Sequence, residues 1–452
     1  MRRLLTLAAT AVLVTACAGE DSPVSTTSVP GGDTTVTSVG VAAPLDDRIT
    51  FVVGLLNGDE LTETDYVAAF TPEFIDNVSY PEFVAVIDQL SATGDDFSVV
   101  AEEERSDLGA VVVVAPASGE PAYRAHVSLE SVIPFRMMGL LLQPTEPPTL
   151  NDPPADLESA ADRLGQLGTL SVLAAEVSDS DCSPIFSRDA DRVAPIGSIF
   201  KLYVLAALVD AVDAGDIDWS DDIVISEELK SVPTGVLQNE DAGETFTVRE
   251  VAEAMIALSD NTATDHLIDA LGRESVEAAF AAWGMAEPDR NIPLLNTLEL
   301  TALKIGPAAG LADQWLDSDE AERREIIQQI SDLTPADLPL AEFDRPIRPD
   351  EIEWFATPED LCRVLTALVD RGEPITSILS INPGIPDPAA LFSTISFKGG
   401  SEPGLVAMSW LTELSDGRRF FLAGSVVDPD EDLDQLEAVL LFGAMRDLLA
   451  DG

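Results

Sequence analysis

A proline-rich segment divides the chain into two regions with different residue patterns. Residues 143–148 read QPTEPP, and Pro153-Pro154 follows shortly before a new helical periodicity begins. Prolines interrupt helices and sheets alike, so a run of them is typical of a boundary between folding units. With 452 residues the chain is also too long for a single hydrophobic core. We therefore predict one domain at 46–142, a linker at 143–154 and a second domain at 155–452.

The N-terminus has the pattern of a targeting segment. It begins Met-Arg-Arg, continues with an apolar stretch at residues 4–16 that is too short to span a bilayer, and reaches Cys17 through small residues. Small residues before a cysteine resemble the lipobox of bacterial lipoproteins, in which the cysteine carries the lipid. We predict a lipoprotein signal peptide at 1–17, lipidation of Cys17 and a flexible linker at 18–45. The alternative is an ordinary secretory signal; either way we expect export, and the lipid would anchor the protein to the outside of the cell membrane.

The chain is strongly acidic. It carries 25 basic and 81 acidic residues, which gives a net charge of −56. Such a surface repels nucleic acid and anionic lipid headgroups, so we expect neither as a partner. The sequence shows no loop with the carboxylate spacing and glycine of a calcium site, and its two histidines alone do not build an ordinary zinc site. We expect a solvated surface, no cofactor and no metal.

Two cysteines remain beyond the N-terminal segment, Cys182 and Cys362. An exported protein can form a disulfide between them, but the sequence alone does not say whether they meet. No CxxC pair is present. We expect two buried free thiols.

The first domain has helical patterns before strand patterns. Apolar residues recur at helical spacing at Phe51 and Leu55, and again at Tyr66 and Phe70. Runs with strand character follow at 97–101, 109–115, 123–129 and 132–142. This order predicts an α+β domain. It resembles the cone-shaped domains of the nuclear-transport-factor and steroid-isomerase type, so we expect a scaffold or binding module. We expect His126, in an alternating strand, to be a half-exposed structural residue.

In the second domain, strand patterns at both ends enclose a helical middle. We expect helices at 157–167, 198–214, 247–258, 261–271, 358–371 and 433–449, and strands at 171–177, 185–188, 391–397, 405–414 and 419–427. Ser-Asp-Gly at 415–417 is typical of a hairpin turn between the last two strands. The pattern predicts a second α+β domain, with an antiparallel sheet of five strands that both ends complete and helices packed on it.

Lysine is scarce, and the few lysines mark the candidate site. The chain has four of them: Lys201, Lys230, Lys304 and Lys398. Ser198 and Lys201 form an S-x-x-K pair, one helical turn apart on one face. Ser-Asp-Asn follows at 259–261 at a junction of two helices, and Lys-Gly-Gly-Ser follows at 398–401 at the end of a strand. Three elements in this order resemble the S-x-x-K, S-D-N and K-T-G set of class A β-lactamases and penicillin-binding proteins.

The resemblance implies a β-lactamase-like domain with helices on both faces of the sheet, a helical subdomain, and a role for each residue. Ser198 is the implied nucleophile, and it needs a base because a serine hydroxyl is a poor nucleophile. Lys201 would be that base once its own proton is lost, which burial and nearby positive charge favour. Lys398 would supply the positive charge and attract a substrate carboxylate. Ser259 would pass a proton to the leaving group, and Asn261 would hold Lys201 or the substrate amide.

The same resemblance assigns the substrate-binding backbone. The N–H groups of Ser198 and Ser401 correspond to the family's oxyanion hole, which stabilises charge on the acyl oxygen. Gly399, Gly400 and Ser401 are the expected substrate-binding residues. Gly399 stands where the family has threonine, so one hydroxyl that helps to hold the carboxylate is missing, and Ser401 is the candidate to replace it.

The base for deacylation is the least regular part of the pattern. Class A enzymes activate water with an ω-loop glutamate that is followed closely by an asparagine. The nearest candidate is Glu299, which lacks that asparagine behind it. The alternative is that Glu299 is an ordinary exposed helix residue. Without a base an acyl-enzyme persists, so we expect a slow hydrolase.

Each element also has a purely structural explanation. Ser198 and Lys201 can simply begin a helix, residues 259–261 can cap one, and Lys398 can be an edge-strand charge. We favour a shared site because the three elements occur in the right order and on the right kinds of structure. A Ser–His–Asp triad competes poorly, because His266 lies in an apolar helix.

A closer resemblance concerns the two-domain arrangement. Residues 398–404 read KGGSEPG, and Glu299-Leu300 with Lys304 lies in a segment typical of the same group. With the cone-like first domain these features are similar to certain actinobacterial lipoproteins and to the β-lactamase-like proteins of clavulanic-acid gene clusters. The resemblance implies a monomer that is acylated at Ser198 by a β-lactam, ester or D-alanyl cell-wall peptide. The alternative is a non-catalytic binding or sensor lipoprotein of the cell envelope on a degenerate fold.

Overall fold

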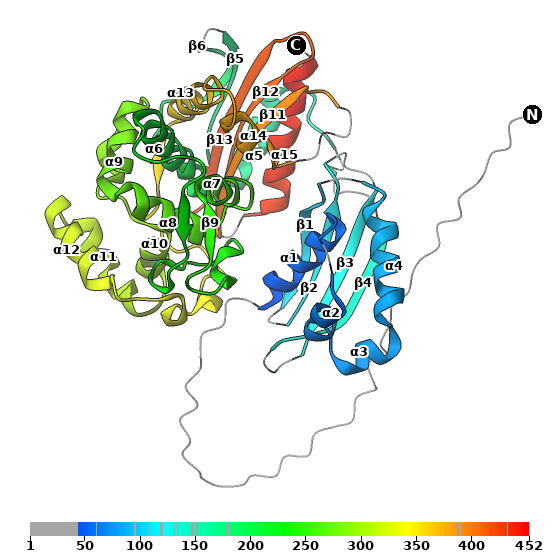
Figure 1. Ribbon diagram of the computed structural model, residues 1–452. Helices are drawn as coiled ribbons and strands as arrows, with labels where there is room; N and C mark the ends of the chain where they lie inside the picture. Colours follow the sequence, from blue (N-terminus) through cyan, green and yellow to red (C-terminus); the bar gives the residue numbers. More distant parts are fainter. Residues whose placement is uncertain are drawn as a thin grey trace, which may run out of the picture. The chain divides into compact units, whose positions relative to one another are not determined.

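A computed structural model of the chain describes residues 44–451, except 60, 95, 107, 118–120, 131, 133, 146–148, 151, 179–180, 386, 388–389 and 432. The signal peptide, Cys17 and nearly all of the linker at 18–45 lie outside the described residues and stay predictions. The chain forms two compact units, Met1–Pro148 and Thr149–Gly452, which we describe separately (Figure 1).

In the first unit, four helices precede a four-stranded sheet. The elements are α1 (Pro44–Leu56), α2 (Glu63–Ala69), α3 (Pro72–Asn77), α4 (Tyr80–Ser91), β1 (Ser98–Ser106), β2 (Gly109–Ala115), β3 (Ala122–Leu129) and β4 (Met137–Thr145). The strands are antiparallel in the order β1-β2-β3-β4. Tyr66, Phe70, Phe74 and Phe83 form an aromatic cluster in its core, with the Phe70 and Phe74 rings stacked at 4.3 Å. The order of elements agrees with the sequence; the cone shape stays a prediction.

Strand β4 differs from its predicted bounds at both ends. The prediction was 132–142, whereas the strand runs from Met137 to Thr145. The residues before it form a turn instead, which Arg136 closes by an ion pair with Glu130 at 2.7 Å, and Phe135 in this turn has a φ of 55°. At its other end β4 pairs with β3 up to its last residue, so the linker was predicted to begin too early.

The second unit contains a five-stranded antiparallel sheet, as predicted. Its order is β11 (Thr394–Glu402), β12 (Leu405–Glu413), β13 (Arg419–Val427), β5 (Thr169–Ser178) and β6 (Asp181–Arg188). Strand β5 pairs with β13 along its length, and this pairing joins the two ends of the unit.

Both faces of this sheet are buried. Odd-numbered residues 173–177 of β5 belong to one hydrophobic core and even-numbered residues 170–174 to another, because successive side chains of a strand point to opposite faces. The second core is covered by α5 (Leu157–Leu167) and α15 (Gln435–Leu448), which Figure 1 shows lying along the sheet.

The helical part lies on the first core. It comprises α6 (Lys201–Ala214), α7 (Val248–Ala257), α8 (Asn261–Leu271), α9 (Arg273–Ala282), α10 (Thr297–Lys304), α11 (Ala312–Asp317), α12 (Glu320–Ile330), α13 (Pro358–Val369) and α14 (Ile375–Ser380). Within the described ranges, no helix is both long enough and apolar enough to cross a membrane.

Two predicted elements near the candidate site had wrong bounds. The helix predicted at 198–214 begins with a 3₁₀ turn, η1 (Gly197–Phe200), and becomes α-helical only at Lys201. The strand predicted at 391–397 starts at Thr394 and continues through the Lys-Gly-Gly-Ser motif to Glu402. The motif is therefore part of the sheet, where its backbone pairs with β12.

Cys182 and Cys362 form a disulfide, so the prediction of two free thiols was wrong. Cys182 lies on β6, the edge strand of the sheet, and Cys362 lies on α13. Their Cα atoms are 6.6 Å apart although 180 residues separate them in the sequence. Only the folded arrangement brings them together, and the bond ties the edge strand to the helical part.

Candidate active site

The candidate nucleophile stands on a tightly held turn. Ser198 is in η1, between the short strand β7 (Ala194–Pro195) and α6, and β7 pairs with β10 (Phe355–Ala356). The backbone N–H of Ile196 donates to the carbonyl of Trp354 at 2.9 Å. The Phe200 ring stacks on the Trp354 ring with centroids 3.7 Å apart. These contacts fix the backbone on both sides of Ser198.

The glycines of the third motif allow this turn to touch the sheet. A Cβ added to Gly400 would lie 2.3 Å from the carbonyl oxygen of Ile196 and 2.5 Å from the backbone nitrogen of Ser198. Gly197, with a φ of 50°, approaches from the other side, and a Cβ there would lie 3.2 Å from the nitrogen of Ser401. Any side chain at Gly400 would push the two segments apart. The backbone amides of Ser198 and Ser401 therefore lie close together.

The second motif forms the junction between α7 and α8. Asp260 caps α8: its carboxylate accepts from the backbone N–H of Ala263 at 2.8 Å and also from Val236 and Leu237 in a neighbouring loop. Ser259, just before the cap, is held at a φ of 55°, which is costly for a residue with a side chain. The hydrogen bonds of this cap offset the backbone strain at Ser259, whose carbonyl and hydroxyl face the two candidate lysines.

Lys201 is fully buried and points at this junction. Its ammonium nitrogen lies 2.5 Å from the carbonyl oxygen of Ser259, 3.2 Å from the Ser259 hydroxyl and 2.7 Å from Oδ1 of Asn261. Burial lowers the pKa of Lys201 to about 7, and the negative charges of Asp260 and Asp265 only partly oppose this shift. A substantial fraction of Lys201 is therefore neutral near pH 7.

Lys398 reaches the same serine from the sheet. Its nitrogen lies 2.9 Å from the Ser259 hydroxyl and 2.8 Å from the carbonyl oxygen of Gly399. Burial, and then the charge of Lys201, hold the pKa of Lys398 well below its usual range. Two amines thus converge on one hydroxyl. Among the described residues, no carboxylate forms a hydrogen bond or an ion pair with either amine.

Gly399 offers no room for the threonine that the motif usually has. A Cβ there would lie 2.8 Å from the ring of Phe397 and 3.4 Å from the sulfur of Met408. Ser401, two residues further on, is exposed. The alternation of the strand places Gly399 on the face opposite to that of Lys398.

Glu299 is held in an ion pair and is not an exposed helix residue, so that alternative was wrong. Its two carboxylate oxygens accept from Arg273 at 2.7 and 2.8 Å, and one of them also accepts from the backbone N–H of Asn296 at 2.9 Å. The side chain is buried at the start of α10. These bonds give Glu299 a clear structural role there.

The two histidines lie where the sequence suggested. His266 is buried in α8, with Nδ1 2.7 Å from the carbonyl of Thr262 and Nε2 accepting from the backbone N–H of Ser226. Burial lowers its pKa. His126 is half-buried on β3. Both are accounted for by packing.

Two residues that support the site, Asp260 and Thr234, were not predicted as such from the sequence. The sequence indicated Asp260 only as the middle residue of a motif, although its carboxylate fixes both the helix and the neighbouring loop. Thr234, whose hydroxyl donates to the carbonyl of Ser259 at 2.8 Å, has no signal in the sequence. The N-cap position of Asp260 was the available signal, because aspartate at this position commonly caps a helix.

Part of the second unit is similar in sequence to known proteins. Residues 159–377 match the model of the "Beta-lactamase enzyme family", a range that includes Ser198 and the Ser-Asp-Asn motif but ends before Lys398. A stretch of 123 residues is 28% identical to "Beta-lactamase AER-1" of Aeromonas hydrophila and covers 26% of this chain and 40% of that protein.

Two solved structures are similar to about two thirds of the chain. A mutant of PBP-A in an acyl-enzyme complex with penicillin G has 21% identity, covering 66% of this chain and 99% of that one, with a TM-score of 0.45. A β-lactamase from Sphaerobacter thermophilus has 21% identity, covering 65% of this chain and 97% of that one, with a TM-score of 0.46.

Proposed function

We propose that the second unit is a serine hydrolase domain of the class A β-lactamase type, in which Ser198 forms an acyl-enzyme with β-lactams, esters or D-alanyl peptides and this ester is hydrolysed slowly. The observation that carries the proposal is the convergence of the Lys201 and Lys398 amines on the Ser259 hydroxyl. Lys201 lies one helical turn after Ser198 in the chain. A pair of buried amines with lowered pKa values is costly for stability alone, and such groups are typical of a catalytic site.

In the proposed acylation, neutral Lys201 accepts the proton of the Ser198 hydroxyl as its oxygen attacks the substrate carbonyl. The N–H groups of Ser198 and Ser401 donate to the oxygen that becomes negative. When the acyl bond to the leaving group breaks, Ser259 gives its proton to the leaving nitrogen or oxygen and takes one from Lys201. Asn261 holds the Lys201 amine in place through its Oδ1.

Lys398 serves substrate binding in this scheme. Burial and the charge of Lys201 lower the pKa of Lys398, and the carboxylate of a bound substrate would raise it and stabilise the ammonium form. Ser401 and the backbone of Gly399 and Gly400 then hold the carboxylate and the acyl group. Substrates with a free carboxylate are therefore expected to react faster than their esters.

Slow deacylation follows from the engagement of Glu299. A carboxylate that neutralises Arg273 with both oxygens is a weak base for a water molecule. We expect Glu299→Gln and Arg273→Gln to lower stability by similar amounts, about 2 kcal/mol, since each breaks the same partly buried pair. The lifetime of the acyl-enzyme should be the same in both variants. A much longer lifetime in Glu299→Gln alone would instead make Glu299 the deacylating base.

A fluorescent penicillin tests the function directly. The protein should become covalently labelled, and Ser198→Ala with an unchanged melting temperature should not. Mass spectrometry should place the adduct on the peptide that contains Ser198. If folded protein is not labelled by several β-lactam and ester probes, the hydrolase proposal fails and the non-catalytic binding alternative takes its place.

The N-terminal part of the proposal concerns location. We propose that the chain is exported and anchored through a lipid on Cys17, with the first unit as a scaffold or binding module. The support is the lipobox-like sequence before Cys17.

A further inference from the structure

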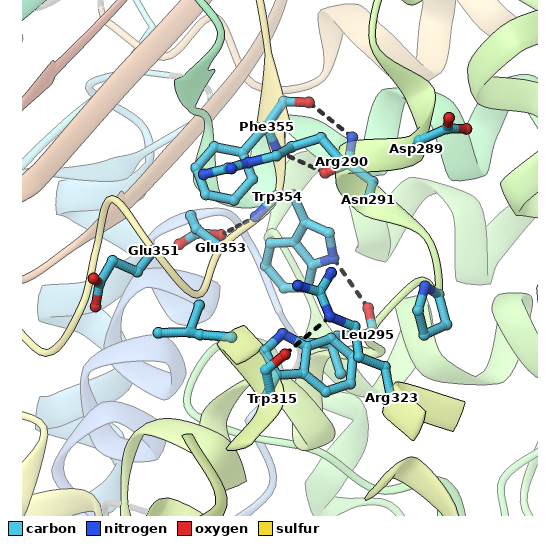
Figure 2. Close-up of a pocket in the computed structure, with 12 residues that line it drawn as sticks. Asp289, Arg290, Asn291, Leu295, Trp315, Arg323, Glu351, Glu353, Trp354 and Phe355 are labelled. Carbon is cyan, nitrogen blue, oxygen red and sulfur yellow. Dashed lines mark hydrogen bonds between the residues drawn. The ribbon is translucent and has the colours of Figure 1, made fainter. Parts of the chain in front are cut away.

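A second cavity of about 420 Å³ lies in the helical part of the second unit (Figure 2). It is bounded by the turn η4 (Pro288–Asn291), by α11 and α12, and by the segment 351–355 that leads into β10. None of its lining residues belongs to the three motifs of the candidate active site. Three aromatic side chains, Trp315, Trp354 and Phe355, line it together with six polar or charged ones.

Two arginines belong to this cavity. The guanidinium of Arg290 lies 4.2 Å from the centre of the Phe355 ring. That of Arg323 lies 5.2 Å from the centre of the Trp315 ring and uses its Nε–H to donate to the Trp315 carbonyl at 2.9 Å. Guanidinium groups that stack on aromatic rings keep their edge N–H groups available for an anion.

These two arginines lack a carboxylate partner. Most arginines of the described chain form ion pairs with aspartate or glutamate, as expected with 81 acidic residues, but Arg290 and Arg323 have none among the described residues. Burial lowers the pKa of Arg323, and the positive charge of Arg290 lowers it further. Two like charges facing one cavity are unfavourable unless something negative lies between them.

The acidic residues of the cavity do not supply that charge. Glu351 is engaged by Arg348 at 2.9 Å. Glu353 is buried, burial and the neighbouring Glu402 carboxylate raise its pKa, and its cationic partner is Lys304, 3.8 Å away. Figure 2 shows Glu351 and Asp289 at opposite sides, with their carboxylates away from the Arg323 guanidinium.

We propose that this cavity binds a small organic carboxylate with a flat, unsaturated or aromatic body. Its carboxylate would accept hydrogen bonds from Arg290 and Arg323, as guanidinium groups bind carboxylates in pairs of bonds. Its flat body would pack against Trp315 and Trp354. The volume is in the usual range for small-molecule sites. The chain has a net charge of −56, which repels an anionic ligand. The two arginines without carboxylate partners give this cavity a local positive charge that attracts one.

Benzoate is a suitable probe, and calorimetric titration of the full chain is the measurement. Benzoate should bind more tightly than cyclohexanecarboxylate, which is not flat, and than acetate or inorganic phosphate. Arg323→Gln and Arg290→Gln should each weaken binding by about tenfold. Arg249→Gln is the matched control, since it removes the same charge from an exposed ion pair on α7 and should leave binding unchanged.

The Ser198→Ala variant separates this site from the proposed catalysis, because benzoate should bind to it as it does to the unaltered chain. Lys398→Met excludes binding at the catalytic amine and should also leave the affinity unchanged. The proposal is overturned if folded protein binds no benzoate at millimolar concentration, if both arginine variants bind it normally, if Lys398→Met abolishes binding, or if phosphate binds equally well.

Discussion

Replacing Lys201 by methionine should slow acylation of Ser198 by roughly a thousandfold, the middle of the range for loss of a general base. Methionine fills a similar volume, so the buried position stays packed while the amine disappears. The contacts of Lys201 with Ser259 and Asn261 hold its amine at this junction, so the substitution removes the proposed general base. Stopped-flow labelling with a fluorescent penicillin measures the rate.

The pH profile makes the test specific. Acylation needs neutral Lys201, whose pKa is lowered to about 7, so the rate should rise with pH and reach half of its maximum near pH 7. Below that value it should fall by about tenfold for each pH unit, because the protonated amine cannot accept a proton. Lys201→Met should lose this dependence.

Lys230→Met is the matched control, since Lys230 pairs with the exposed Glu227 and is remote from the motifs in sequence. It should keep both the rate and the profile. An acylation rate that stays constant between about pH 6 and pH 8 in the unaltered chain would contradict the assignment of Lys201 as the base.

Replacing both Cys182 and Cys362 by alanine should lower the free energy of unfolding by about 5 kcal/mol. The disulfide closes a loop of 180 residues, and in the chain-entropy description a bond that closes so long a loop restricts the unfolded state strongly. Urea denaturation followed by tryptophan fluorescence measures the change in the unfolding transition of the second unit.

Two comparisons separate the disulfide from the packing of its sulfur atoms. Reducing the unaltered chain should produce the same loss, and the double variant should not respond to reductant. Equal midpoints for oxidised chain, reduced chain and double variant would show that the bond does not limit the unfolded state.

The sequence predicted most of the second unit because its signals are local. Strand β13 and helices α5 and α8 have the predicted bounds, since alternation and helical periodicity mark them clearly. The Ser-Asp-Asn motif could also be placed at a junction of two helices, because these three residue types are good helix-capping residues. Structural elements whose signals lie within one short segment could therefore be inferred from the sequence.

Features that depend on distant contacts could not be predicted. The disulfide requires that β6 and α13 meet, and the pairing of Glu299 with Arg273 requires that α9 and α10 do. The 3₁₀ geometry of η1 arises where Gly197 and Gly400 press two backbones together, which no helical periodicity reveals. The cavity with Arg290 and Arg323 likewise has no sequence pattern.

The pairing of β5 with β13 has a consequence for how the protein folds as it is synthesised. Strand β5 can pair with β6 as soon as both are synthesised, but its pairing with β13 waits for the last strand, and Lys398 on β11 is also synthesised late. Such long-range pairing is slow to form. A growing or truncated polypeptide therefore holds Ser198 without its partners, so reactivity should switch on only when translation, and any transport across a membrane, is complete.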